Sequence, residues 1–351
     1  MHTGEPIRIC IRGMSGMLGN RLAICLDKQK DMTLTAGIVR NGVHLDKILN
    51  GFASTNRLPE HIYLDAGKDV VKSLNKSQSR VKFEHIEQLN LSDVCDIVID
   101  TTPSGNGKAW RDRYAAFGKY VVFQSGAFPD GSLITPPYLI KDKREKFFRQ
   151  GNCIISALSP IFYALDEMIE SAKINVIMQY TGKLLVDIPT NQRIHSTYLA
   201  DELFLQMNEE LGSLFPYKNI RLSDLYQVPS LDYYSMSLHL VLKEKVTKKN
   251  IRKILMDTPR IFVTPDVITS TYEIDHFLRE QVKESGNDLP PITVYGCDLA
   301  DDIRRNEIVI RAAIYSRTIA VLPNIDAIRM LVKDEDPIEA MRRTDTYAGF
   351  S

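Results

Sequence analysis

The stretch "IRICIRGMSGMLGNRLAICL" (residues 7–26) decides how the first part of the chain folds. Its opening residues, 7–11, alternate and are rich in β-branched side chains, which is typical of a strand. Gly13, Gly16 and Gly19 follow at a spacing of three, and leucines then recur four residues apart, as on a helix. A strand, a glycine loop and a helix in this order let a pyrophosphate approach the backbone N–H groups at the helix N-terminus. A tight turn without a ligand is the alternative, and the context favours the phosphate.

The same alternation of strands and helices continues to about residue 126. We expect strands at 32–39, 96–100 and 119–126, and a helix at 108–117. Such alternation predicts a parallel sheet, and ligands of parallel sheets bind at the carboxyl ends of the strands. The residues expected to hold the cofactor are therefore those of the glycine loop and of these strand ends: Gly13, Ser15, Gly16, Met17, Leu18, Arg40, Thr101, Thr102, Pro103, Ser125 and Gly126.

The end of the second expected strand bears on the choice of dinucleotide. A site selective for NAD usually places Asp or Glu there to hold the ribose hydroxyls, and this chain has Arg40 and Asn41 instead. A guanidinium can pair with a 2′-phosphate, so the sequence favours NADP over NAD. The alternative for Arg40 is a solvated surface arginine.

Composition bounds the class of protein. The chain has 351 residues, enough for two domains, with 44 basic and 44 acidic side chains. This balance favours neither nucleic acid nor a membrane surface as partner, and no apolar run is long enough to span a bilayer. The five cysteines show no metal or disulfide spacing, and a strand starts too early for a signal peptide. We expect a cytoplasmic protein with reduced thiols, no metal and a small-molecule substrate.

The second half changes character. In "GNCIISALSP" (151–160) we expect a buried strand at 153–157, then a helix over 159–173 that Ser159 caps, with Pro160 at its first position. Further strands at 174–182 and 235–246, a helix at 247–259, and two strands and an amphipathic helix within 306–332 complete the pattern. The predicted fold is therefore α/β: a Rossmann-type domain, residues 1–156 with about 324–351, and an α+β domain for substrate and oligomerisation, 157–323.

Several motifs carry a resemblance to a known family. "DIVIDTTPSGNGK" (96–108), "DTPRIFV" (257–263) and "RTIAVLPNIDAIRML" (317–331) occur in the order found in archaeal-type (type II) glyceraldehyde-3-phosphate dehydrogenases, which the chain resembles over nearly its whole length. The resemblance implies a nicotinamide cofactor, NADP or NAD, and a homotetramer. The strongly amphipathic stretch "LPNIDAIRML" predicts in addition a final helix that returns to the first domain. The resemblance also implies that Asn324, in the third motif, touches the cofactor.

The chemistry-bearing motifs depart from that family. Its catalytic cysteine lies in an "SCNTTG" turn, and alignment with "SALSPI" (156–161) puts Ala157 at the cysteine position. Without a thiolate no thioester forms. Cys153 lies four residues back, roughly 13 Å along a strand at ~3.3 Å per residue, and this distance argues against it as a substitute nucleophile and favours a buried strand thiol.

Hydride transfer by itself needs only a placed nicotinamide and one proton donor. Tyr234 and His195 are the candidates, because they lie where the family has its base histidine and its substrate loop. Tyr233, His239 and Tyr315 are more typical of structural positions, and Lys183, Arg193 and Arg317 could hold an anionic substrate. The sequence therefore predicts an NAD(P)-dependent oxidoreductase that reduces or oxidises a small carbonyl, alcohol or imine without a covalent thioester. The alternatives are a phosphorylating aldehyde dehydrogenase that uses another thiol, Cys153, and a non-catalytic nucleotide-binding regulator.

Overall fold

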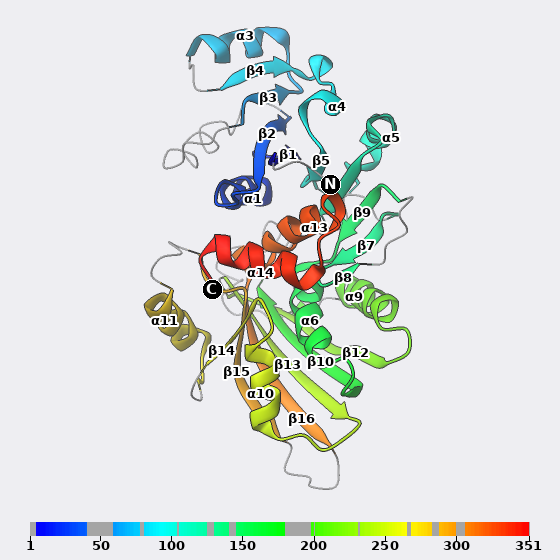
Figure 1. Cartoon of the computed structure of the whole chain (residues 1–351), viewed down its shortest axis with the longest axis vertical. Coiled ribbons are helices and arrows are strands. Elements are labelled where there is room, and N and C mark those ends of the chain that lie inside the picture. Colours follow the sequence, from blue (N-terminus) through cyan, green and yellow to red (C-terminus); the bar gives the residue numbers. More distant parts are fainter. Residues whose placement is uncertain are drawn as a thin grey trace. The chain divides into compact units, whose positions relative to one another are not determined.

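The computed structural model describes most of the chain in two compact units. The described residues are 5–40, 59–77, 81–103, 105–124, 130–139, 145–179, 198–199, 201–230, 232–264, 268–282, 288–299 and 306–350. Unit 1 comprises Met1–Asn152 and Ala320–Ala348, and unit 2 comprises Cys153–Ile319 and Gly349–Ser351 (Figure 1). The first boundary falls at residue 152 rather than 156, because residues 153–156 begin a helix of unit 2.

Unit 1 is built on a sheet of nine described strands in the order β4-β3-β2-β1-β5-β6-β9-β7-β8. All neighbours pair in parallel except β7 and β8. The strands are β1 (Ile7–Arg12), β2 (Met32–Val39), β3 (His61–Leu64), β4 (Lys82–His85), β5 (Ile97–Asp100), β6 (Tyr120–Gln124), β7 (Ser132–Thr135), β8 (Tyr138–Leu139) and β9 (Phe147–Gln150). Because β1 pairs with both β2 and β5, the strand order reverses at β1, which is where ligands bind in such sheets.

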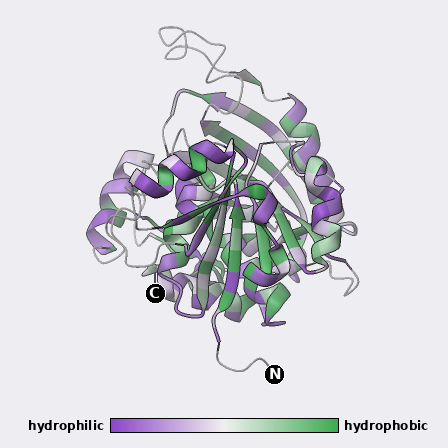
Figure 2. Cartoon of the chain, turned by 90° about the horizontal axis from the view of Figure 1, so that it is seen from above, coloured by the Kyte–Doolittle hydropathy of each residue, from purple (hydrophilic) through white to green (hydrophobic). Residues whose placement is uncertain are grey.

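The helices of unit 1 connect these strands. They are α1 (Met17–Asp27), α3 (Lys68–Ser77), α4 (Leu91–Val94), α5 (Arg111–Phe117), α13 (Leu322–Val332) and α14 (Pro337–Ala348), with 3-10 turns at Ile86–Gln88 and Lys108–Trp110. Figure 2 shows hydrophobic residues concentrated along the strands, whereas the helices mix hydrophobic and hydrophilic residues. This α/β architecture with a largely parallel sheet confirms the predicted fold class.

The last two helices belong to unit 1 through a buried cation. Arg329 of α13 has no exposed surface, and its guanidinium contacts both carboxylate oxygens of Asp31 at 2.6 and 3.0 Å. It also donates to Gln29 in unit 1 and to Thr344 of α14. Helix α13 was expected to be amphipathic, but ten of its eleven residues are buried. The ion pair explains how an arginine is accommodated in such a helix, since buried charges require partners.

Unit 2 contains a mixed sheet of seven described strands in the order β11-β12-β10-β13-β16-β15-β14. The strands are β10 (Ile169–Gln179), β11 (Tyr198–Leu199), β12 (Asn219–Val228), β13 (Tyr233–Leu242), β14 (Ile261–Val263), β15 (Ile292–Leu299) and β16 (Glu307–Tyr315). The helices are α6 (Cys153–Ala164), α9 (Asp201–Leu214), α10 (Lys248–Met256), α11 (Thr271–Gln281) and α12 (Ser316–Ile319). The predicted antiparallel strand β13 and the Thr247 cap of α10 are confirmed.

Two predictions of secondary structure in this half are wrong. Residues 153–157 are not a strand, because α6 begins at Cys153 and continues through Pro160 to Ala164. The run from Ile154 to Phe162 is buried on every side, so it lacks the periodicity that separates a core helix from a core strand. Downstream, β10 begins at Ile169, inside the predicted helix, and residues 306–332 give one strand and two helices instead of two strands and one helix.

Close packing in the glycine loop yields a stability prediction. A Cβ at Gly19 would lie 2.4 Å from the carbonyl oxygen of Gly13, a backbone atom that cannot move aside. We expect Gly19→Ala to destabilise unit 1 by about 1–3 kcal/mol, as overpacking does. Gly212 in α9 has no atom within 4 Å of its Cβ position, so Gly212→Ala should stabilise by about 0.4–1 kcal/mol. Urea denaturation followed by circular dichroism measures both, and equal midpoints for the two variants would contradict the packing argument.

Candidate functional site

The loop between β1 and α1 has the shape that a dinucleotide phosphate requires. Gly13 adopts φ 81°, and the N–H of Gly16 donates to the Gly13 carbonyl at 2.9 Å. Gly16 is the N-cap of α1 and provides no side-chain cap, and the first turn holds no acidic residue. Met17 is 86% exposed. The N-terminus of α1 thus presents backbone donors and a positive dipole without a carboxylate to compete, which fits a bound anion.

Residues after β5 close the other side of this loop. The hydroxyl of Thr101 donates to the carbonyl of Arg12 at 2.9 Å, and a Cβ at Gly13 would lie 2.9 Å from the same hydroxyl oxygen. Thr102 donates to Asp100 Oδ1 at 2.6 Å, and Pro103 is exposed. The structure therefore brings Thr101 and Thr102 together with the loop residues Gly13, Ser15, Gly16, Met17 and Leu18 at one edge of the sheet.

A buried carboxylate that sequence reasoning missed anchors this edge. Asp100, the last residue of β5, has no exposed surface and pairs with Arg12 at 2.7 Å. It also accepts the hydroxyl of Tyr114 at 2.8 Å, and burial together with this carboxylate raises the pKa of Tyr114. The Arg12 guanidinium stacks over Trp110 at 4.4 Å. The sequence does contain a signal for this pair, because a charged residue ends each of the two apolar strands: Arg12 ends β1 and Asp100 ends β5.

The remaining predicted cofactor residues have different outcomes. Asn324 of α13 is fully buried and accepts a hydrogen bond from Gln124, the last residue of β6, so it lies at the same edge. Ser125 and Gly126 lie outside the described residues. Arg40 follows β2 and is exposed. Asp65 was not considered, yet its N–H donates to the carbonyl of Val39 at 3.1 Å, so an acidic residue also lies beside the end of β2.

Cys153 is the first residue of α6 and differs from the other four cysteines, which are all buried. Its thiol lies 3.5 Å from the hydroxyl oxygen of Tyr234, to which it donates a hydrogen bond. Burial raises the pKa of this thiol, while hydrogen bonding with Tyr234 opposes the increase. Position at a helix N-terminus favours a reactive thiolate, whereas the raised pKa is typical of a buried structural thiol.

Ala157, in contrast, lies one helical turn further along and has no exposed surface. Because residues 153–157 are helical, Cys153 and Ala157 are neighbours on one face, about 5–6 Å apart between Cβ atoms, and not roughly 13 Å apart. The argument that distance removes Cys153 from the chemistry is therefore wrong.

The candidate side chains on β13 lie on opposite faces of the sheet, because side chains alternate along a strand. Tyr234 is buried on the face that meets Cys153, whereas Tyr233 and His239 alternate onto the opposite face. Tyr233 pairs in register with Tyr315 and donates to Asp275 at 3.2 Å. His239 is exposed and lies 3.3 Å from the Ser237 hydroxyl. Tyr234 lies within 3.5 Å of the thiol, and His195, the second predicted catalytic residue, lies outside the described residues.

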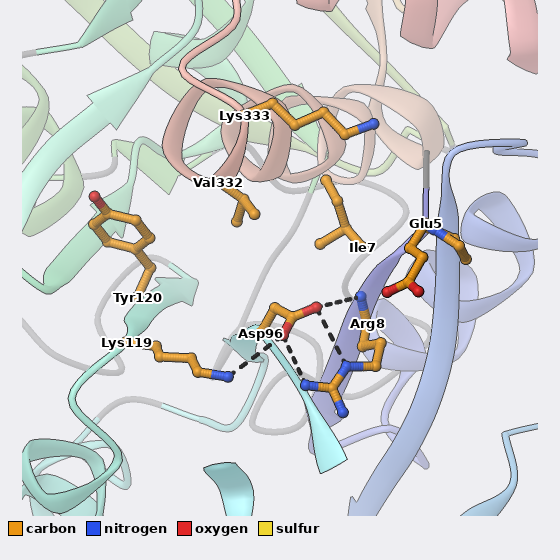
Figure 3. Close-up of a pocket in the computed structure, with 9 residues that line it drawn as sticks. Glu5, Ile7, Arg8, Asp96, Lys119, Tyr120, Val332 and Lys333 are labelled. Atoms are coloured by element: carbon orange, nitrogen blue, oxygen red, sulfur yellow. Dashed lines mark hydrogen bonds and ion pairs between the residues drawn. The ribbon is translucent and has the colours of Figure 1, made fainter. Parts of the chain in front are cut away.

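A cavity of about 560 Å³ lies at the opposite, amino edge of the parallel sheet. Figure 3 shows Asp96 between Arg8 and Lys119, with Lys333 on the helix above. Arg8 contacts Asp96 at 2.8 Å, Lys119 contacts it at 3.4 Å, and Lys333 contacts Asp31 at 3.3 Å. Because these cations already have carboxylate partners, this cavity provides little unmatched charge for a ligand. The carboxyl edge is the better candidate site.

The described part of the chain contains neither a candidate metal site nor a helix that could span a membrane. Among its side chains, no group of three or more His, Cys, Asp or Glu is placed to hold a metal ion. None of its helices is long and apolar enough to cross a bilayer.

Known proteins resemble this chain over almost its full length. Glyceraldehyde-3-phosphate dehydrogenase from Saccharolobus islandicus (strain L.S.2.15 / Lassen #1) is 24% identical over 369 residues, covering 98% of each chain. The enzymes of the same name from Saccharolobus solfataricus and Sulfurisphaera tokodaii are 22% and 23% identical, covering 98% and 93% of this chain. Aspartate semialdehyde dehydrogenase II from Vibrio cholerae superposes with a TM-score of 0.63 at 14% identity, over 94% of this chain and 99% of that one. No protein-family model matches.

The relatives, the fold and the glycine loop all indicate the same class of protein. The chain is an NAD(P)-dependent oxidoreductase, similar in sequence to archaeal glyceraldehyde-3-phosphate dehydrogenases and in fold to aspartate semialdehyde dehydrogenase. The predicted class of enzyme is thereby confirmed, and so is the nicotinamide type of cofactor.

The exposure of the cysteines yields a labelling prediction. We expect iodoacetamide to modify Cys153 well before Cys10, Cys25, Cys95 and Cys297 in the native protein, because only Cys153 is accessible. The rate should rise with pH through the raised pKa of the thiol, because the thiolate is the nucleophile and forms above that pKa. Peptide mass spectrometry after timed quenching measures the order of labelling. Faster modification of a buried cysteine would contradict it.

Proposed function

We propose that this oxidoreductase is an aldehyde dehydrogenase whose nucleophile is Cys153. One observation supports the proposal above all: the half-buried thiol at the N-terminus of α6 lies 3.5 Å from the Tyr234 hydroxyl. A nucleophile beside a fixed hydrogen-bond donor is the arrangement that covalent catalysis at a carbonyl requires. The relatives' names, a phosphorylated aldehyde and a semialdehyde, support aldehyde chemistry.

Chain connectivity supports the same assignment. Only Gly151 and Asn152 separate Cys153 from the last residue of β9, and the N–H of Gly151 donates to the carbonyl of Ile134 at 3.1 Å. Three residue steps span at most about 11 Å. Cys153 therefore follows in sequence directly after β9, a strand that continues the parallel series β1, β5 and β6.

The proposed dinucleotide site consists of the loop residues Gly13, Ser15, Gly16, Met17 and Leu18, together with Thr101, Thr102, Pro103 and Asn324. These roles are part of the proposal, and so are those of Ser125 and Gly126. When bound, the nicotinamide supplies the two-electron acceptor for oxidation, or the donor for reduction.

Cys153 and Tyr234 would perform the steps on the substrate. The thiolate attacks the carbonyl carbon, an S–C bond forms, and the π electron pair moves onto oxygen, which accepts the hydrogen bond or proton of a donor. Loss of hydride from that carbon leaves a thioester. Water or phosphate then attacks the acyl carbon, and the C–S bond breaks to return the thiolate.

Tyr234 acts as a donor in this scheme and not as a base. Burial raises the pKa of its hydroxyl far above neutral, and the neighbouring sulfur raises it further, so the phenol keeps its proton. The hydroxyl can stabilise negative charge on the thiolate or on the carbonyl oxygen. A base that activates water or phosphate must come from elsewhere, and His195 is our candidate.

The proposed substrate is a small aldehyde with an anionic group, by analogy with the compounds in the relatives' names. Arg317, one of the cations considered for this group, already forms a two-pronged ion pair with Asp232 at 2.5 and 2.8 Å. Lys183 and Arg193 lie outside the described residues. The cytoplasmic location and the homotetramer stay predictions.

A second function has one observation in its favour. Tyr234 could donate a proton to a carbonyl that is reduced without a covalent intermediate, since its hydroxyl lies beside Cys153 whichever chemistry occurs. In that case the thiol is dispensable.

Replacement of the thiol separates the two functions. We expect Cys153→Ala to lower aldehyde-dependent formation of reduced nicotinamide by ~10³-fold or more, because no thioester can form. Cofactor affinity, measured by nicotinamide fluorescence, should not change. Stopped-flow assays with a panel of small aldehydes and ketones, in both directions, provide the measurement. Carbonyl reduction that survives in Cys153→Ala at wild-type rate would favour the second function, and the absence of a trapped acyl-enzyme in wild type would count against the first.

The choice between NADP and NAD depends on the side chains that lie at the end of β2. We propose NADP as the preferred dinucleotide, because Arg40 is exposed beside the expected ribose. Arg40→Glu should weaken NADPH binding by about 10-fold or more, the effect of a lost charge-assisted hydrogen bond, and leave NADH binding within a few-fold. Fluorescence titration of both cofactors measures it, with Arg113→Glu on α5 as the control. A wild-type preference for NADH would favour Asp65 as the ribose ligand instead.

A further inference from the structure

Two side-chain amides meet at the carboxyl edge of the unit 1 sheet. Asn324, in the first turn of α13, has no exposed surface, and its Oδ1 accepts a hydrogen bond from Nε2 of Gln124, the last residue of β6. Its Nδ2 donates to the carbonyl oxygens of Ala320 and Val321 at 3.1 and 3.4 Å. Both polar groups of Asn324 are therefore engaged inside unit 1, away from solvent.

These contacts fix which way the Gln124 amide points. A carbonyl oxygen only accepts, so the nitrogen of Asn324 must face Ala320 and its oxygen must face Gln124. An amide oxygen also only accepts, so Gln124 must present its nitrogen to Asn324. Oε1 of Gln124 is left for another donor, and none of the described residues supplies one. The half-buried Gln124 thus keeps an acceptor at the edge where the cofactor loop lies.

Gln124 also keeps a donor beside this acceptor. A side-chain amide nitrogen carries two N–H groups, and the hydrogen bond to Asn324 uses one of them. An acceptor and a donor on one amide are complementary to a primary carboxamide, whose NH2 donates and whose oxygen accepts. The nicotinamide ring carries such a carboxamide next to the carbon that exchanges hydride.

The place of Gln124 in the sheet matches the nicotinamide half of a dinucleotide. In sheets of this kind the pyrophosphate lies at the glycine loop after β1, and the adenosine ribose lies near the end of β2. The other half of the molecule therefore extends to the opposite side of β1, over the ends of β5 and β6. Neighbouring strands are ~4.8 Å apart, so the end of β6 lies about 10 Å across the sheet from β1.

We propose that Gln124 binds the carboxamide of the nicotinamide, with Oε1 as the acceptor, and that Asn324 is a positioning residue that orients Gln124. The family resemblance implies that Asn324 itself touches the cofactor, whereas its hydrogen bonds place it behind Gln124. This assignment rests on the dinucleotide site proposed above. It does not depend on which residue acts as the nucleophile.

A cofactor analogue that differs only in this group provides the test. The 3-acetylpyridine analogue of NADPH has a methyl ketone in place of the carboxamide, so it keeps the carbonyl oxygen and loses the N–H donors. We expect the wild-type protein to bind NADPH about 10-fold more tightly than the analogue, because the analogue leaves Oε1 unpaired. Gln124→Met keeps the length of the side chain without its polar groups, so it should bind both ligands within about 2-fold of each other. Isothermal titration calorimetry measures both affinities without turnover.

Two controls separate the carboxamide contact from general damage to the site. Gln124→Met should bind 2′-phospho-ADP-ribose, which lacks the nicotinamide ring, within about 2-fold of wild type. Gln281→Met, at the exposed end of α11, makes the same substitution elsewhere and should keep the wild-type preference for NADPH. An unchanged preference in Gln124→Met, or an equal loss of affinity for the ring-free fragment, would overturn the proposal.

The positioning role of Asn324 is tested by combining variants. Asn324→Ala removes the acceptor that orients Gln124, so most of the preference for NADPH over the analogue should disappear. Adding Asn324→Ala to Gln124→Met should change this preference no further, because Asn324 acts through Gln124. A preference that survives in Gln124→Met and disappears only with Asn324→Ala would instead put Asn324 on the carboxamide.

Failure of this assignment and failure of the dinucleotide site give different results. Gly16→Val adds a branched side chain where the backbone must approach the pyrophosphate, so it should weaken binding of NADPH and of the ring-free fragment by about 10-fold or more. If it does so while Gln124→Met keeps the wild-type preference, the dinucleotide site holds and the role of Gln124 is wrong. If Gly16→Val binds both ligands normally, the dinucleotide site is wrong, and the role of Gln124 is wrong with it.

Discussion

Parallel pairing of β1 with both β2 and β5 is the constraint on which the site depends. Parallel strands end at a common edge, so the loops that follow them meet there regardless of their distance in sequence. The glycine loop follows β1, Thr101 and Thr102 follow β5, and Gln124 ends β6 where it meets Asn324 of α13. The same rule places the end of β9 at this edge, and α6 begins with Cys153 three residues later.

Buried charge keeps that arrangement in register. Asp100 and Arg12 end neighbouring strands, and their ion pair, with the Tyr114 hydroxyl, satisfies a carboxylate that has no access to water. Arg329 and Asp31 do the same for α13, the helix that provides Asn324. An unpaired partner in either pair would be costly, so the strand ends and α13 are held to a narrow set of positions.

The chemistry proposed for the thiol differs from that of a cysteine activated by a base. Tyr234 remains protonated, since its raised pKa excludes the phenolate at neutral pH, so its hydroxyl accepts from the neutral thiol and can donate to a thiolate or a carbonyl oxygen. A thiol beside a donor is stabilised as thiolate without being deprotonated by its neighbour, so proton removal falls to solvent or to substrate-borne groups.

Sequence alone determined the parts governed by local pattern. The glycine spacing, the apolar strands and the Thr247 cap act within a few residues of themselves, so β1, α1, β2, β13 and α10 were predictable. The residues 153–160 were not, because a segment buried on every side has no polar face to reveal its period, and Pro160 looked like a helix start. Only the tertiary structure decided that α6 begins at Cys153 and that Tyr234, not Tyr233, faces the sulfur. Those contacts join residues up to 81 positions apart, and their formation depends on packing, to which no local pattern is sensitive.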